Sequence, residues 1–198
     1  MSLYCEPAPR FIAGRLALDF VNNFPPKAEL SWDPLMAFLE SARIVTPERG
    51  YLTRSNAQAA EALLGKAQAL ATALRLAFDA VLRKQRVLRE WIEPVNEILR
   101  ITEGHDELVP TGNDWEIQFV ASESGLEWLL AAVARSAAEI IAEGPHARLR
   151  LCANPRCGLF FYDTSRTHRR RWCSMMVCGN RHKVAAFARR ASVRHARP

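Results

Sequence analysis

The spacing of apolar residues in the first half of the chain predicts a set of amphipathic helices. Apolar side chains recur every three or four positions in residues 14–23, 34–44, 55–89 and 94–100. Asp33 followed by Pro34 is a typical start of a helix, because proline is favoured in the first turn. Each of these segments is expected to turn one apolar face toward a common core.

The pattern changes after residue 104. Pro110, Gly112 and Asn113 favour a turn, and residues 115–120 alternate between apolar and polar as a strand does. A helical pattern returns over residues 123–143 and is ended by a Gly-Pro pair. Residues 148–151 alternate again, which indicates a short strand. The pattern predicts a mainly α protein with a small β-hairpin.

Length and composition set limits on this picture. The chain has 198 residues, of which 49% are hydrophobic and 24% charged, so it can bury a core and is not of the disordered class. This length suits one domain, or a domain with a small module. The first ten residues do not resemble a signal peptide, and the apolar stretches fall short of the roughly 20 residues that span a bilayer. We expect a soluble, cytoplasmic protein without a membrane partner.

The net charge of +6 is unevenly distributed. Residues 148–198 hold thirteen Lys and Arg but one acid, Asp163, a net charge of +12; this leaves 14 basic and 20 acidic residues, a net charge of −6, in residues 1–147. A strongly basic end on an acidic body points to a polyanionic partner, most often nucleic acid. We place the domain boundary between residues 147 and 148.

Four of the five cysteines lie in the basic end. Cys152 and Cys157 form one pair and Cys173 and Cys178 the other, each pair separated by four residues and the pairs by fifteen. Two thiol pairs on turns, joined by a hairpin-sized insert, can bind one Zn²⁺ tetrahedrally, and four sulfur ligands leave no open position, so we expect a structural zinc. The alternatives are buried, unligated cysteines and an iron–sulfur cluster. The fifth cysteine, Cys5, stands apart.

The basic residues around these cysteines are candidates for nucleic-acid contacts. Arginine forks suit phosphate oxygens, and the pattern after Cys178 predicts a basic helix over residues 180–197 on the zinc module. The candidates are Arg166, Arg169, Arg170, Arg171, Arg181, Lys183, Arg190 and Arg194. A solvated basic surface without a partner is the alternative.

The run Cys173-Ser-Met-Met-Val-Cys178-Gly179-Asn180-Arg181, with Phe161-Tyr-Asp-Thr-Ser-Arg166 before it, resembles the CGNR zinc finger. Residues 16–22 (LALDFVN) resemble the N-terminal signature of the helical ABATE domain that precedes this finger. Together the two resemblances cover essentially the whole chain. They imply a stress-induced bacterial transcription regulator with a small zinc module, of treble-clef or knuckle type, that ends in a helix. DNA binding is inferred for that family mainly from its positive charge.

The body, residues 1–147, is a candidate for effector binding or for homodimer formation. Four polar residues interrupt its apolar faces and could line a small-molecule pocket: Asp19, Asn22, Arg75 and Asn96. The alternative is that they are partnered within the fold, with Asp19 pairing with an arginine and the asparagines capping helices.

Two further functions remain open from the residues, and a third, an enzyme, is weighed against them. Phe161, Tyr162 and Trp172 could stack on the bases of RNA. Oxidation of zinc thiolates could release the metal and act as a redox sensor. An enzyme is not expected, because no Ser-His-Asp set, zinc-protease motif or phosphate-binding loop is present.

Overall fold

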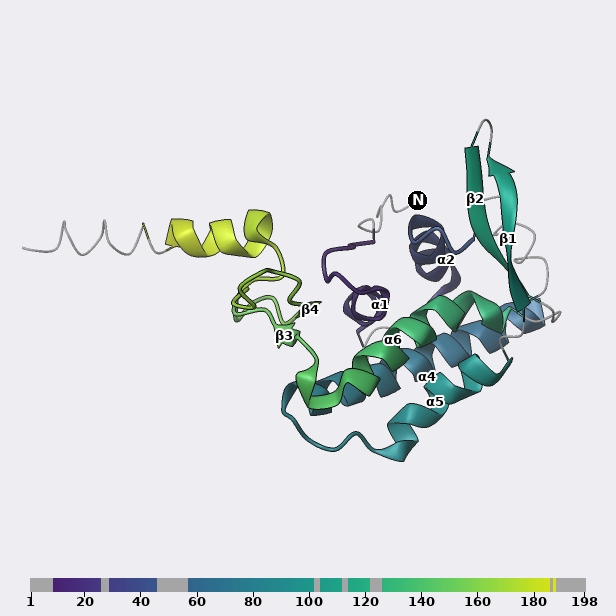
Figure 1. The fold of residues 1–198 in the computed structure, drawn as a ribbon, viewed down its shortest axis with the longest axis horizontal. Coiled ribbons are helices and arrows are strands. Elements are labelled where there is room, and N and C mark those ends of the chain that lie inside the picture. The colour runs from purple at the N-terminus through teal and green to yellow at the C-terminus, as the bar shows by residue number, and fades with distance from the viewer. Residues whose placement is uncertain are drawn as a thin grey trace, which may run out of the picture.

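The computed structural model describes residues 9–25, 29–45, 57–101, 104–111, 114–121, 126–185 and 187, and side chains are considered outside residues 101–125. Helices form the body, and a small module with two short strands lies beside one end of it (Figure 1). The body helices are α1 (Leu16–Asn23), α2 (Trp32–Ser41), α4 (Ala57–Leu82), α5 (Arg89–Ile101) and α6 (Ala131–Glu143).

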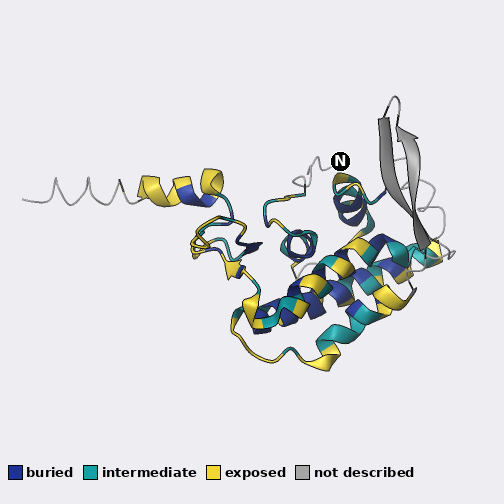
Figure 2. Cartoon of the chain, viewed as in Figure 1, coloured by how far each residue is buried: buried dark blue, intermediate teal, exposed yellow. Residues whose placement is uncertain are grey.

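Helix α4 is the centre of the body. Its buried residues recur at helical spacing, as in Leu63, Leu70, Leu74 and Phe78, and alanines between them allow close approach of neighbouring helices. Helices α1, α5 and α6 all contact α4, and α6 also packs on α1 and α5. The predicted amphipathic helices are therefore present and share one core, as the dark faces in Figure 2 show.

Several helix boundaries differ from those expected: α2 spans Trp32–Ser41 and not residues 34–44, and α6 begins at Ala131 after a 3-10 turn at Glu127–Leu130. The stretch predicted as one helix to residue 89 ends at Leu82, where Lys84 adopts a left-handed backbone with φ of 57°. Helix α5 begins at Arg89 and not at Pro94, which lies inside it. Proline removes one backbone donor there, and the buried Val95 and Ile98 hold the helix against its neighbours.

Two antiparallel hairpins complete the fold. Strands β1 (Gly104–Thr111) and β2 (Asp114–Ala121) pair from Gly104 with Ala121 to Thr111 with Asp114. Strands β3 (Leu149–Leu151) and β4 (Phe160–Tyr162) pair from Leu149 with Tyr162 to Leu151 with Phe160. Only β2 and β3 were expected as strands.

The predicted fold class, a mainly α chain with a small hairpin and a cysteine module that ends in a helix, is confirmed. The terminal helix is described over residues 180–185 and at 187, and the rest of its predicted length lies outside the described residues. One buried cluster runs from the body into the module and includes Phe20, Phe78, Phe160 and Cys173. Among the described helices, none has the length and apolar character needed to cross a membrane.

Candidate metal centre and its surroundings

The β3–β4 hairpin positions the first cysteine pair. Cys152 directly follows β3, and its amide donates to the carbonyl of Leu159 at 2.9 Å, which closes the loop between the strands. Inside the loop the Asn154 side chain accepts from the amide of Arg156 at 3.1 Å, and the Asn154 carbonyl accepts from the amide of Cys157 at 2.9 Å. This tight turn at Asn154 brings Cys157 back toward Cys152.

A short turn of π-helix, Met175–Gly179, positions the second pair. The hydroxyl of Ser174 accepts from the amide of Val177 at 3.3 Å, and the Ser174 carbonyl accepts from the amides of Cys178 and Gly179, each at 3.0 Å. Gly179 is buried, and a Cβ there would clash with the sulfur of Met175. The turn therefore packs closely where Cys178 faces Cys173.

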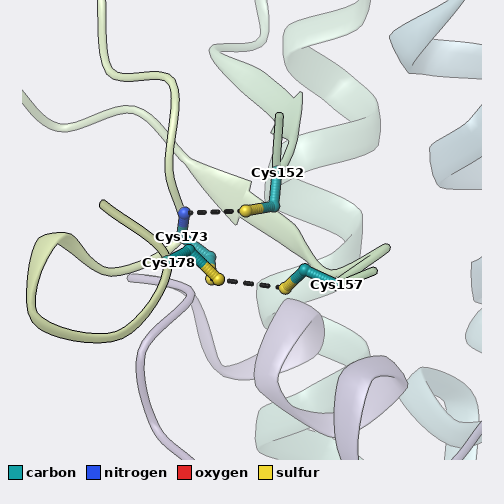
Figure 3. Close-up of side chains that lie close together, drawn as sticks. All are labelled: Cys152, Cys157, Cys173 and Cys178. Carbon is teal, nitrogen blue, oxygen red and sulfur yellow. Dashed lines mark hydrogen bonds between the residues drawn. The ribbon is translucent and has the colours of Figure 1, made fainter. Parts of the chain in front are cut away.

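The four sulfur atoms lie within 4.8 Å of one another (Figure 3). Sγ of Cys173 lies 3.6 Å from Sγ of Cys157 and 3.8 Å from Sγ of Cys178. Sulfurs at the corners of a tetrahedron around zinc, with Zn–S of about 2.3 Å, are about 3.8 Å apart. These separations are far too long for a disulfide, so the cluster has the donor set and the spacing of a four-sulfur metal site.

The sulfurs differ in how readily they ionise without a metal. Burial and the neighbouring thiols raise the pKa of Cys173, and burial raises the pKa of Cys157. Burial also acts against ionisation of Cys178, but hydrogen bonds from the Asn154 amide, at 3.4 Å, and from the other thiols outweigh it and lower its pKa. A bound cation would favour ionisation of all four.

Helix α1 binds the edge of this module. The side-chain amide of Asn22 donates to the carbonyl of Phe160 at 2.8 Å, and its oxygen accepts from the Phe160 amide at 3.0 Å. One asparagine thus satisfies both backbone groups of a β4 residue, as a neighbouring strand would. We call the contact between residues 12–22 and residues 160–173 the seam.

The segment before α1 extends the seam. The amide of Tyr162 donates to the carbonyl of Ala13 at 2.7 Å, and Gly14 follows with φ of 80°, which turns the chain into α1. The buried carboxylate of Asp19 accepts from the amides of Ile12 at 2.9 Å and Ala13 at 2.8 Å. Burial raises the pKa of Asp19, and the two backbone hydrogen bonds partly oppose that rise.

The guanidinium of Arg170 closes the seam from the module side. It donates to the carbonyl of Trp172 at 2.9 Å, to that of Cys173, and to that of Ile12 at 3.4 Å, and it lies over the ring of Phe161 at 4.8 Å. Arg170 was predicted to contact nucleic acid. In the structure its guanidinium is hydrogen-bonded within the chain, next to a cysteine of the cluster, and a contact with nucleic acid stays a prediction.

Asp163, the one acid of the basic end, is fully buried. It accepts from the amide and the hydroxyl of Ser165, at 3.0 and 2.6 Å, from the amide of Arg170 at 3.0 Å, and from Nε of Arg150 at 3.0 Å. Burial tends to raise the pKa of Asp163, but the Ser165 and Arg170 hydrogen bonds and the charge of Arg150 outweigh it and lower the pKa. From the sequence, Asp163 entered only the charge count, and its role in ordering the loop was not predicted.

The other predicted cationic residues that the structure describes face outward. In the described part of the chain, no acidic side chain lies within ion-pair distance of them. Arg156, which was not among the predicted contacts, is exposed in the same way. Arg171 lies over the Trp172 ring at 5.3 Å. Arg190 and Arg194 lie outside the described residues. We call the following exposed cations the outer face: Arg156, Arg166, Arg169, Arg171, Arg181 and Lys183.

Three of the four residues predicted to line a ligand pocket have partners within the fold. Asp19 and Asn22 form the seam, and Arg75 lies over the Phe160 ring at 4.5 Å. Asn96 is half-buried on α5. The alternative stated from the sequence was that Asp19 pairs with an arginine and that the asparagines cap helices. In the structure Asp19 accepts from backbone amides, and Asn22 pairs with β4. A small-molecule pocket at these four residues stays a prediction.

Two models of known families match the chain. The model for the ABATE family, described as "putative stress-induced transcription regulator", matches residues 14–144, and the model for the CGNR zinc finger matches residues 148–191. No curated protein matches the chain. The first match covers well over half of the 198 residues, and both agree with the resemblance carried by the sequence motifs. The chain therefore belongs to the ABATE family and ends in a CGNR zinc finger.

Proposed function

We propose that this chain is a transcription regulator that binds one structural Zn²⁺ through Cys152, Cys157, Cys173 and Cys178 and binds duplex DNA through the outer face. The zinc would fix the β3–β4 loop to the turn that follows Cys173, and it leaves no coordination position for catalysis. The proposal assigns no enzymatic activity to the chain.

The burial of Asp163 carries the DNA-binding part of the proposal. The basic end has thirteen cations and this single acid, and the acid is enclosed and paired with Arg150. Every charged side chain exposed among residues 148–185 is consequently positive. A uniformly positive surface attracts a polyanion such as nucleic acid and repels other positively charged surfaces.

The structure favours duplex DNA over single-stranded RNA as the polyanion. Stacking on RNA bases would need open aromatic faces, but Phe161 and Tyr162 are buried. Trp172 is half-buried, with Arg171 over its ring and His182 at 4.8 Å between ring centroids. The module therefore offers cations and few stacking surfaces, which suits contacts with a phosphate backbone.

The acidic body is proposed as the input part of the regulator. Its net charge of −6 disfavours contact with the duplex, and effector binding or dimer formation would affect DNA binding through the seam.

Metal analysis and a salt titration test the proposal. We expect one zinc per chain, and a logarithm of the duplex association constant that falls linearly with the logarithm of salt concentration, with a slope of about −0.9 per phosphate contact. Single-stranded RNA of equal length should compete less well than duplex DNA. Absence of zinc, or absence of salt-dependent duplex binding at low salt, would refute it.

A further inference from the structure

The turn and helix after Cys173 carry apolar side chains on the outside of the module. Met176 is 84% exposed and Val184 69% exposed, and the helix points away from the body and is exposed along most of its visible length (Figures 1 and 2). These side chains border a shallow hollow that also contains one amide and one guanidinium. The hollow is lined by Met176, Val177, Asn180, Arg181, Val184 and Ala185.

The spacing of these residues gives the helix two distinct sides. Positions 177, 180, 181 and 184 follow the three- and four-residue spacing of one helix face. His182 instead packs its ring against Trp172, with centroids 4.8 Å apart and planes at 35°. Contact between His182 and the module thus leaves the side with Asn180, Arg181 and Val184 free to meet a partner.

Phosphate binding alone does not account for this combination of side chains. An exposed apolar side chain gains nothing from a phosphate oxygen, and asparagine carries no charge. Arginine, asparagine and apolar side chains all have partners on base edges in the major groove of DNA. Arginine pairs with guanine, asparagine pairs with adenine, and apolar groups contact the methyl of thymine. The hollow therefore differs in chemistry from the arginines around it.

We propose that the hollow reads base edges in the major groove, with Asn180 and Arg181 as the specificity-determining residues and Val177 and Val184 as thymine contacts. This inference rests on the proposed duplex binding. The exposed cations Arg169 and Arg171 lie outside the hollow and contact phosphates without reading sequence. The partner is DNA because every exposed charge among the described residues 148–185 is positive and the major groove has the width of a helix.

The test uses the full-length, zinc-loaded protein and a library of duplexes with a randomised centre. Repeated selection by the wild type should enrich a short motif. Arg181→Lys keeps the charge but loses the fork, so the preference at one position should fall by roughly five- to 150-fold, while binding to unselected duplex stays within a few-fold. Asn180→Ala should relax a neighbouring position. Arg169→Ala, the matched control, should weaken binding to all sequences and leave the motif unchanged.

The outcomes separate this inference from the proposed function. A wild type that binds duplex with a salt slope but enriches no motif overturns base reading and leaves DNA binding intact. Failure to bind duplex at all overturns both. An enriched motif that is unchanged in Arg181→Lys and Asn180→Ala also overturns the inference, and a change in self-association of Val184→Ser would then assign the hollow to a protein partner. Zinc content and far-ultraviolet circular dichroism of each variant verify that the exposed substitutions leave the fold intact.

Discussion

The two sides of the zinc module use the same residue types in opposite ways. At the seam and the adjoining loop, the buried Asp163 accepts from Arg150 and from the Arg170 amide, and the Arg170 guanidinium donates to backbone carbonyls. On the outer face, Arg169 and Arg171 sit in the same short run as Arg170 but are exposed. The role of each arginine therefore does not follow from its position in the run. It follows from its partners: the seam side offers a buried acid and backbone carbonyls, and the outer face offers solvent.

This contrast gives each substitution a separate expected signature. Changes at the seam should alter the free energy of unfolding and leave the salt slope of DNA binding in the folded protein unchanged. Changes on the outer face should alter the salt slope of DNA binding and leave the free energy of unfolding unchanged. A variant that moves both quantities together would break the comparison.

The largest effect is expected from loss of a metal ligand. Cys173→Ser removes a buried sulfur that lies within 4 Å of two others, so the module should lose zinc and with it several kcal/mol of folding free energy. Because α1 is bound to β4 through the seam, the melting temperature of the body should fall too, although its helices persist. Zinc content and thermal unfolding followed by circular dichroism measure both effects.

Cys5→Ser is the matched control for this experiment, because Cys5 lies outside the cluster in sequence. It should keep one zinc per chain. Retention of a full zinc equivalent by Cys173→Ser would contradict the four-sulfur site.

A smaller loss is expected when the buried acid is neutralised. Asp163→Asn loses the charge that Arg150 and the Ser165 and Arg170 donors face, at a cost of about 3 kcal/mol. The pKa of Asp163 is lowered in the folded chain, so the carboxylate stabilises the fold above the usual value of 3.8, and this contribution is lost as pH falls through the lowered pKa.

It follows that the difference in unfolding free energy between wild type and Asp163→Asn should be the same at pH 8 and pH 5.5. Urea unfolding of the zinc-loaded proteins at the two values measures it. A difference that shrinks by pH 5.5 would mean that Asp163 is not held in its ionised form.

Neighbouring arginines provide the sharpest test of the two sides. Arg170→Ala should lower the free energy of unfolding by about 2 kcal/mol, because it leaves the carbonyls of Ile12, Trp172 and Cys173 without this donor. Arg169→Ala should change stability by less than about 0.5 kcal/mol but reduce the salt slope by about 0.9. Unfolding and DNA titrations on the same preparations compare them, and a wild-type salt slope for Arg169→Ala would show that Arg169 makes no phosphate contact.

The sequence was sufficient to predict what depends on local pattern. Helical periodicity predicted α1, α4 and α6, and cysteine spacing predicted the cluster, because a helix face and a pair of turns are fixed by nearby residues. The charge split likewise needed only counting.

Long-range partners could not be predicted in the same way. Asn22 and Phe160 are 138 positions apart, and nothing in either segment indicates that an asparagine of a helix would pair with the backbone of a strand. The same holds for Arg170 and Ile12, 158 positions apart. One signal was present for Asp163: a lone acid in a strongly basic segment indicates a structural partner more than a surface charge.

Asn22 also provides the smallest of the predicted effects and the most direct test of the seam. Asn22→Ala leaves the amide and carbonyl of Phe160 without their partner in a half-buried position, which should lower the free energy of unfolding by about 1.5 kcal/mol. Asn96→Ala, the same change at a half-buried position on α5, should cost less than about 0.5 kcal/mol. Urea unfolding of both zinc-loaded variants measures the difference. Equal losses would indicate that the module does not depend on α1, and a loss confined to Asn22→Ala with zinc content unchanged would indicate that body and finger unfold as linked parts.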